Sequence, residues 1–365
     1  MLKENPENGY QLIYRDYIYM DWLIRLFHYD MYEAKNYQRD HNYRYGPIVA
    51  KISEWALILP YKYWPALWFG LSILLAGVSY FFLDKSLDLR INPISGLLVV
   101  LGYPSSVYLI SLYQNSFVSL AIVCSAGYLV CKKKSFLAGL LFGVIFYKPQ
   151  ILVYVTAFVL FTGNIRFVLG AGLSSTLFML ISLAVCGLDA HLYWFQSLSE
   201  VMRGIQGDEM QTNIPWKGFV LTVFPEAWHQ AGLIGGQVIM FAVFIWSQWM
   251  IWHQRKEGAW KEWYSLYWGV AFWALFSPHV KVYELSLALP CWFLMLSLQS
   301  SFYKKDEALK VDTLHGLFWT SGFLALFCRF IGASIVAPLL TLWYILCLLL
   351  MSKKVSVPSK SLKTG

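Results

Sequence analysis

One polar motif in this chain has residues that could handle a phosphate. The stretch Ser277-Pro-His-Val-Lys-Val-Tyr-Glu284 interrupts a hydrophobic run that extends from Trp263 to Leu298. Ionisable groups near membrane depth are costly and are by default functional hypotheses. His279 and Lys281 suit a phosphate or pyrophosphate leaving group, because both can donate hydrogen bonds and the lysine brings a positive charge. The alternative is a boundary loop that is polar only because it meets water.

Two further polar breaks divide other apolar runs. Lys148 stands directly before Pro149, where a helix must end or kink, and it offers a compact charge for a phosphate unless it only snorkels to the interface. Gln150 follows it. Gln114 and Asn115 could bind sugar hydroxyls, or they could serve as polar glue between helices. Three such breaks in an otherwise apolar chain predict one shared polar cavity.

The N-terminal segment supplies a candidate general base. Asp16, followed by Tyr17, can deprotonate a hydroxyl nucleophile if it lies near a pocket at the membrane surface. The alternative is a solvated surface aspartate, and Asp21 and Asp30 are local competitors. Arg203, in a later loop, is a weaker candidate for a phosphate contact, because basic residues are common at membrane interfaces.

The composition predicts an integral membrane protein. Hydrophobic residues make up 58% of the chain and charged residues only 14%, whereas a soluble domain carries roughly 25% charged residues. The net charge of +8 does not indicate nucleic-acid binding, because the basic residues lie in short loops between apolar runs. The six cysteines lie in or beside apolar runs, without metal-ligand spacing.

The hydrophobic pattern predicts about eleven transmembrane helices in an all-α bundle. The expected segments are 65–83, 93–112, 116–131, 135–147, 150–163, 167–187, 233–252, 262–277, 282–300, 314–331 and 333–351. The segments 135–147 and 150–163 are too short to cross upright, so we expect tilted helices that end deep in a cavity or a re-entrant pair. Amphipathic helices are expected at 48–59, at 191–203 and after Asn213.

The distribution of Lys and Arg predicts the orientation. One set of alternating loops is rich in basic residues, including Lys132, Lys133 and Lys134, and is therefore expected on the cytoplasmic side. The three polar breaks then face the other side. The expected division is an outer N-terminal segment, a first bundle, an outer loop, a second bundle and a cytoplasmic tail, over residues 1–64, 65–187, 188–232, 233–351 and 352–365.

An ordered series of short motifs adds a family resemblance. In chain order they are Asp16-Tyr17 with Tyr29-Asp30-Met31-Tyr32, Tyr45-Gly46-Pro47, Leu59-Pro60, Trp64-Pro65-Ala66-Leu67-Trp68, Gln114-Asn115, Ala138-Gly139 with Lys148-Pro149-Gln150, Asn213-Ile-Pro-Trp-Lys-Gly218, and Ser277-Pro278-His279 with Tyr283-Glu284. Together they resemble glycosyltransferase family 87, of the membrane-embedded GT-C superfamily.

The resemblance implies inverting transfer of a hexose, often mannose, from a polyprenyl-phosphate donor to a lipid-linked or glycan acceptor on the outer face of the bacterial inner membrane. It implies that Asp16 is the catalytic base and that Lys148, His279, Lys281 and Arg203 hold the donor phosphate. The sugar or acceptor would contact the remaining candidates: Tyr17, Gln114, Asn115, Gln150, Tyr283 and Glu284. No cofactor is expected, and the outer loops contain no Asp-x-Asp pair that would favour a metal.

Other interpretations remain open at this point. The family places a transmembrane helix before its catalytic aspartate, so we expect that the chain starts late or is a fragment. A flippase or another transporter of lipid-linked sugars would also use a charged cavity, although this chain shows no internal repeat. The sequence is also compatible with a ligase that moves a whole glycan and with an inactive scaffold subunit.

Overall fold

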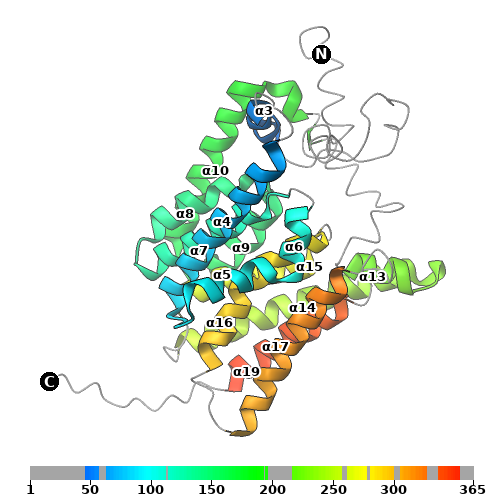
Figure 1. Ribbon diagram of the computed structural model, residues 1–365. Coiled ribbons are helices and arrows are strands. Elements are labelled where there is room, and N and C mark those ends of the chain that lie inside the picture. Colours follow the sequence, from blue (N-terminus) through cyan, green and yellow to red (C-terminus); the bar gives the residue numbers. More distant parts are fainter. Residues whose placement is uncertain are drawn as a thin grey trace, which may run out of the picture.

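In a computed structural model of the protein, the described residues are 46–56, 63–111, 114–192, 194–195, 216–256, 261–277, 280–299, 305–326 and 336–353. They form an all-helical molecule (Figure 1). The first half contains α3 (Pro47–Ala56), α4 (Trp64–Leu87), α5 (Pro93–Gly102), α6 (Pro104–Ser111), α7 (Ser116–Cys131), α8 (Ser135–Gly143), η3 (Val144–Tyr147), α9 (Pro149–Phe161) and α10 (Ile165–Cys186). The second half contains α13 (Trp216–Val223), η4 (Glu226–Trp228), α14 (His229–Lys256), α15 (Glu262–Phe276), η5 (Val282–Ala288), α16 (Leu289–Gln299), α17 (Lys305–Leu326) and α19 (Val336–Lys353).

The described parts of the expected hydrophobic segments fall mainly on helices, but the number of membrane crossings is not confirmed. Three helical stretches have the length and hydropathy of a complete span: Pro65–Leu87, Ile165–Cys186 and Glu226–Arg255. A fourth is possible if α5 and α6 form one span, and these two helices are bent by 68°. Eleven crossings therefore stay a prediction.

The surface of α10 supports insertion in a membrane. Its outward side chains include Leu169, Leu173, Leu177 and Leu180, each about half exposed or more. An apolar face of this length would be unfavourable in water, whereas lipid tails would cover it without cost. The described part of the chain therefore belongs to a membrane protein.

Prolines and asparagines determine where several helices begin. Asn92 caps α5 by accepting a hydrogen bond from the backbone N–H of Ile94, and Pro93 takes the first helical position. Asn164 caps α10 in the same way through the N–H of Phe167. These caps lie in the connections that the basic residues predict to be cytoplasmic.

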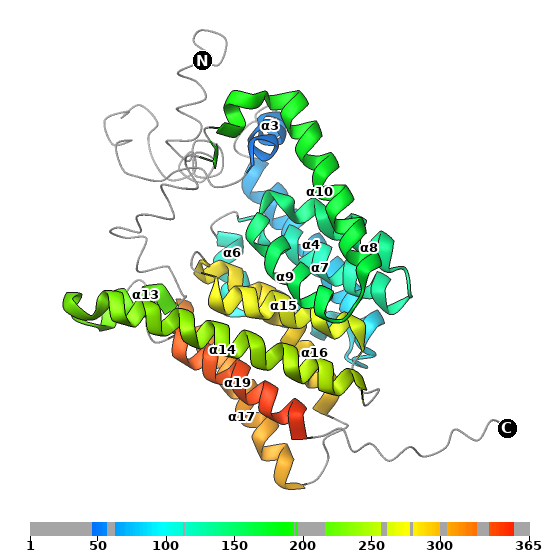
Figure 2. The same ribbon diagram turned by 180° about the vertical axis from the view of Figure 1, so that it is seen from behind.

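The helix α15 is the centre of the fold. Every residue from Tyr264 to Phe276 is buried. The helix packs against α7, α9 and α16, and Figure 2 shows it between α9 and α14. A helix that is apolar all round and fully covered in this way fits a protein-enclosed position in a bundle.

The expected amphipathic helices are partly visible. A helix is present for the described part of the prediction at 48–59, because α3 runs to Ala56 and packs against α10. Its position at the membrane interface stays a prediction. The stretch after Asn213 continues into α13, where Trp216 donates a hydrogen bond to the carbonyl of Gly232. Most of the segment 191–203 lies outside the described residues.

The helices α8 and α10 cross at very short range. A Cβ atom at Gly139 would overlap the carbonyl oxygen of Phe167, and a Cβ at Gly170 would overlap the carbonyl oxygen of Phe136. Small residues that allow such close backbone approach are typical of helix contacts in membranes. This crossing fixes α8, and through it η3 and the start of α9.

We expect Gly170→Ala to lower the thermal unfolding midpoint, whereas Gly172→Ala does not. Both positions lie on α10, but a Cβ at Gly172 meets nothing within 4 Å. Overpacking typically costs about 1–3 kcal/mol, while alanine in an unobstructed helical position is favourable by up to about 1 kcal/mol over glycine. Thermal unfolding in detergent measures both effects. Equal midpoints for the two variants would contradict the close crossing.

Candidate functional site

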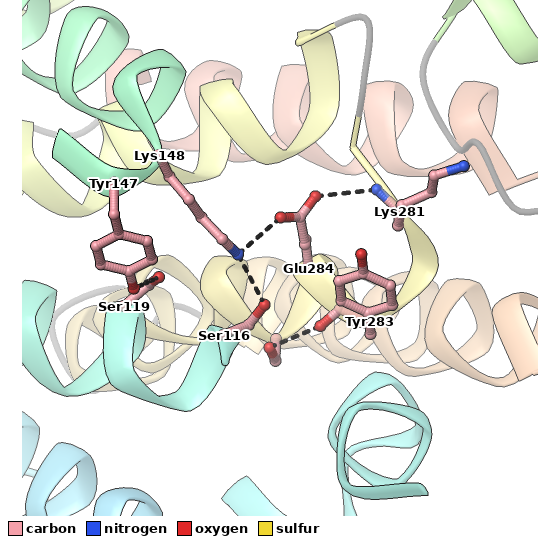
Figure 3. Close-up of polar contacts among 8 residues, drawn as sticks. Ser116, Ser119, Tyr147, Lys148, Lys281, Tyr283 and Glu284 are labelled. Atoms are coloured by element: carbon pink, nitrogen blue, oxygen red, sulfur yellow. Dashed lines mark hydrogen bonds and ion pairs between the residues drawn. The ribbon is translucent and has the colours of Figure 1, made fainter. Parts of the chain in front are cut away.

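Two of the polar breaks of the sequence meet, and the third directly precedes Ser116, which Lys148 contacts. Lys148 Nζ lies 2.9 Å from Glu284 Oε1 and donates a hydrogen bond of 3.3 Å to Ser116 Oγ. Figure 3 shows these contacts, which join the starts of α7 and α9 to η5. We call Ser116, Lys148, Glu284 and the backbone N–H of Lys281 the polar cluster. The contact between Lys148 and Glu284 confirms that two of the breaks come together. The shared cavity stays a prediction.

Lys148 is positioned by a change of helix type. The short 3₁₀ helix η3 ends at Tyr147, the N–H of Lys148 bonds the carbonyl of Ile145 at 2.7 Å, and α9 begins at Pro149. Proline favours the first helical position and restricts the residue before it, which explains why the chain turns at Lys148. The Lys148 side chain is 5% exposed. The lysine is therefore an interior charge and does not snorkel to the surface.

Glu284 is held through both of its carboxylate oxygens. Oε1 pairs with Lys148, and Oε2 accepts a hydrogen bond of 3.1 Å from the backbone N–H of Lys281. In Figure 3 the Lys281 ammonium extends away from Glu284, and the hydrogen bond from Lys281 to the carboxylate comes from its backbone N–H. The side chain of Glu284 is 9% exposed.

The start of α7 brings further polar groups beside the lysine. Asn115 precedes the helix and Ser116 is its first residue. Asn115 is buried, and its Oδ1 has no hydrogen-bond partner within the described ranges. A buried acceptor without a partner is costly. Asn115 is thus a candidate acceptor for a hydroxyl of a bound molecule.

A second hydrogen bond fixes the same two segments. The hydroxyls of Ser119 and Tyr147 lie 2.6 Å apart and both side chains are buried. Ser116 and Ser119 are three residues apart on α7, so they lie on the same face of the helix. One face of α7 therefore contacts both Tyr147 and Lys148, which determines where the lysine lies.

Tyr147→Phe is expected to raise the donor KM several-fold while kcat changes less. The variant removes one buried hydrogen bond, worth about 1 kcal/mol, and frees the segment that carries Lys148. Ser119→Ala should have the same effect, and the double variant should be no worse than either single one. Steady-state kinetics of the three variants measure this. Additive losses would show that the two hydroxyls act independently.

The electrostatics of the cluster favour the binding of one anion. Lys148 carries a buried positive charge, and α7 and α9 both begin at the cluster, where helix N-termini carry partial positive charge. Among the described residues, Glu284 is the anion that meets this charge. Removing one partner of such a buried pair typically costs about 3–5 kcal/mol, because the other charge is left uncompensated.

The sequence-predicted site residues have different outcomes. Lys148 and Glu284 come together, and Lys281 is buried and donates its backbone N–H to Glu284. Gln114 and Asn115 are buried directly before Ser116, and Gln150 and Tyr283 are half-buried. The candidates Asp16, Tyr17, Arg203 and His279 lie outside the described residues. The roles of all these residues stay predictions.

Three residues of the site were missed by the sequence reasoning. Ser116, Ser119 and Tyr147 all contact or flank the polar breaks. The available signal was the position of Ser116 directly after Gln114-Asn115, and the three-residue spacing to Ser119. Serines are too common at helix starts for this signal to be noticed without the partner residues.

Comparison with known proteins gives one match. The family model for glycosyltransferase family 87 matches residues 43–278, which is more than half of the 365 residues. The matched segment includes Ser116 and Lys148. No curated protein and no solved structure matches the chain significantly. On the strength of the family match over this segment, the chain belongs to glycosyltransferase family 87.

Proposed function

We propose that the protein is an inverting hexosyltransferase that uses a polyprenyl-phosphate sugar as its donor. The single observation that carries the proposal is the buried Lys148 ammonium, which lies between Ser116 and Glu284 in a chain of this glycosyltransferase family. An ionisable group so deep in an apolar bundle is by default a functional candidate, and a lipid-linked sugar would bring a phosphate to it.

The proposed reaction is a single displacement. Asp16 removes the proton from an acceptor hydroxyl as that oxygen attacks the anomeric carbon of the sugar. The new C–O bond forms on the face opposite the phosphate, which inverts the configuration. The bond from the anomeric carbon to the phosphate oxygen breaks, and the leaving polyprenyl phosphate keeps the electron pair. The phosphate charge thereby becomes more negative, from about −1 to −2. We assign the stabilisation of this developing negative charge to Lys148.

Other candidates would support this reaction at the same face. His279, Lys281 and Arg203 would add donors to the phosphate, while Tyr17, Gln114, Asn115, Gln150, Tyr283 and Glu284 would contact the sugar or the acceptor. The distribution of basic residues supports an active site on the outer face of a bacterial inner membrane, with a cytoplasmic C-terminus. Mannose is the first sugar to test, and a lipid-linked or glycan acceptor is expected.

The test is a transfer assay with the purified protein in lipid nanodiscs. We expect labelled hexose to move from polyprenyl-phosphate-hexose, mannose first, to a component of a bacterial membrane extract. A nucleotide-linked sugar should give no transfer. Transfer from the nucleotide sugar alone would contradict the proposed donor, and movement of the intact lipid-linked sugar across a bilayer without transfer would indicate a flippase.

A further inference from the structure

The ammonium assigned to the donor phosphate already has an anion beside it. Glu284 Oε1 lies 2.9 Å from Lys148 Nζ, and the two side chains are 9% and 5% exposed. Building on the proposed function, we infer that Glu284 is a resident anion that holds Lys148 in the empty site and is displaced by the phosphate of the donor. The lysine then exchanges its carboxylate partner for a phosphate, and the carboxylate becomes free to face the sugar.

The charges favour replacement of Glu284 by the phosphate over simultaneous contact of both anions with Lys148. A phosphate beside Lys148 would place two anions next to one ammonium in a poorly solvated site, where repulsion between like charges is strong. Among the described residues of the polar cluster, the other positive contributions are the partial charges at the starts of α7 and α9, and the Lys281 ammonium extends away from Glu284 in Figure 3. The partial charges help to bind one anion but do not compensate a second.

Glu284 is attached in a way that permits release. Besides its pairing with Lys148, it accepts a hydrogen bond from the backbone N–H of Lys281 at 3.1 Å. It is carried by η5, a 3₁₀ helix, and such helices have poorer hydrogen-bond geometry than α-helices. Rotation of the Glu284 side chain alone would break both contacts.

The displaced carboxylate has a second use. An ionised carboxylate only accepts hydrogen bonds, so beside a sugar it would bind hydroxyl groups. Asn115 Oδ1, which has no partner within the described ranges, is another acceptor close to Ser116 along the chain. The exchange therefore links recognition of the phosphate to recognition of the hexose. A neutral sugar lacks the charge needed to start it.

The experiment compares Glu284→Gln with the unaltered protein in a maltoside detergent, which contains no phosphate. Glutamine keeps the size and the Oε1 acceptor but removes the competing charge. Glu226→Gln is the matched control, because Glu226 is exposed on η4. The probes are farnesyl phosphate, farnesol as the same lipid without phosphate, and inorganic phosphate, each titrated by calorimetry.

We expect Glu284→Gln to bind farnesyl phosphate more tightly than the unaltered protein, with a dissociation constant about tenfold lower. Farnesol binding and the Glu226→Gln control should be unchanged. If Glu284→Gln binds inorganic phosphate more tightly by the same factor, any phosphate displaces Glu284. If only farnesyl phosphate binds more tightly, the displacement requires the lipid-linked phosphate. Unchanged or weaker binding of farnesyl phosphate by Glu284→Gln overturns the inference, because a purely supporting glutamate would give that result.

A measurement on the unaltered protein avoids dependence on how the variant folds. Hydrogen exchange in a peptide covering Lys281–Ala288 should become faster when farnesyl phosphate binds, because the Lys281 N–H loses the Glu284 carboxylate. Farnesol should not have this effect, and an unchanged or slower rate with farnesyl phosphate would overturn the exchange. If hydrogen exchange is unchanged or slower but the protein still transfers sugar, the proposed function stands and only the displacement of Glu284 is refuted. If the phosphate displaces Glu284 but the protein transfers no sugar, the proposed function is contradicted instead.

Discussion

Lys148→Met is expected to lower sugar transfer by about 100-fold or more, the usual effect of removing a group that stabilises a developing negative charge. The donor KM should rise more than the acceptor KM, because the ammonium contacts the phosphate of the donor and not the acceptor. Steady-state kinetics with each substrate varied in turn measure the difference. An unchanged donor KM would contradict the proposed contact.

The variant also breaks a buried ion pair, so folding needs its own control. Lys148→Met leaves Glu284 as an uncompensated buried charge, which typically costs about 3–5 kcal/mol. The double variant Lys148→Met with Glu284→Gln removes both charges and should recover most of the unfolding midpoint. It should not recover transfer. Recovery of both would show that Lys148 only supports the fold.

Asp16→Asn is expected to abolish transfer while leaving the amount of protein in the membrane unchanged. Asparagine keeps the size of the side chain but cannot take the proton from the acceptor hydroxyl, so the nucleophile is not activated. A general base contributes about 10²–10⁴-fold to a rate, so the transfer rate should fall by a factor in that range. Donor binding should be nearly unchanged, because the base contacts the acceptor.

The neighbouring aspartates provide matched controls. Asp21→Asn and Asp30→Asn make the same chemical change in the same N-terminal segment. Both variants should transfer sugar at nearly the normal rate. Near-normal transfer by Asp16→Asn, or loss of transfer in one of the controls instead, would refute the assignment of the base to Asp16.

Much of the helical architecture follows from the sequence alone. The break at Lys148-Pro149 was predictable, because proline excludes the preceding residue from a helix interior, and the structure places the start of α9 there. The expected segment 116–131 coincides with α7. Apolar runs flanked by polar residues and prolines leave few options besides helices in a membrane.

The number of crossings and the pairing of the polar groups could not be obtained in this way. Hydropathy gives the length of an apolar run but not its tilt or bend, and the expected segment 93–112 is divided by a 68° bend between α5 and α6. The contact between Lys148 and Glu284 joins residues 136 positions apart. No local pattern encodes such a pairing, because it depends on how α7, α9 and η5 pack around α15.

The central claim is that Lys148 holds the phosphate of a lipid-linked sugar donor. The most direct test is an experimental structure of the protein with polyprenyl phosphate bound, from which the distance between the nearest phosphate oxygen and Lys148 Nζ is measured. The account predicts that a phosphate oxygen lies within about 4 Å of Nζ, the limit for an ion pair, and that the Glu284 carboxylate has left the lysine. A phosphate bound elsewhere, with the Lys148–Glu284 pair intact, would contradict it.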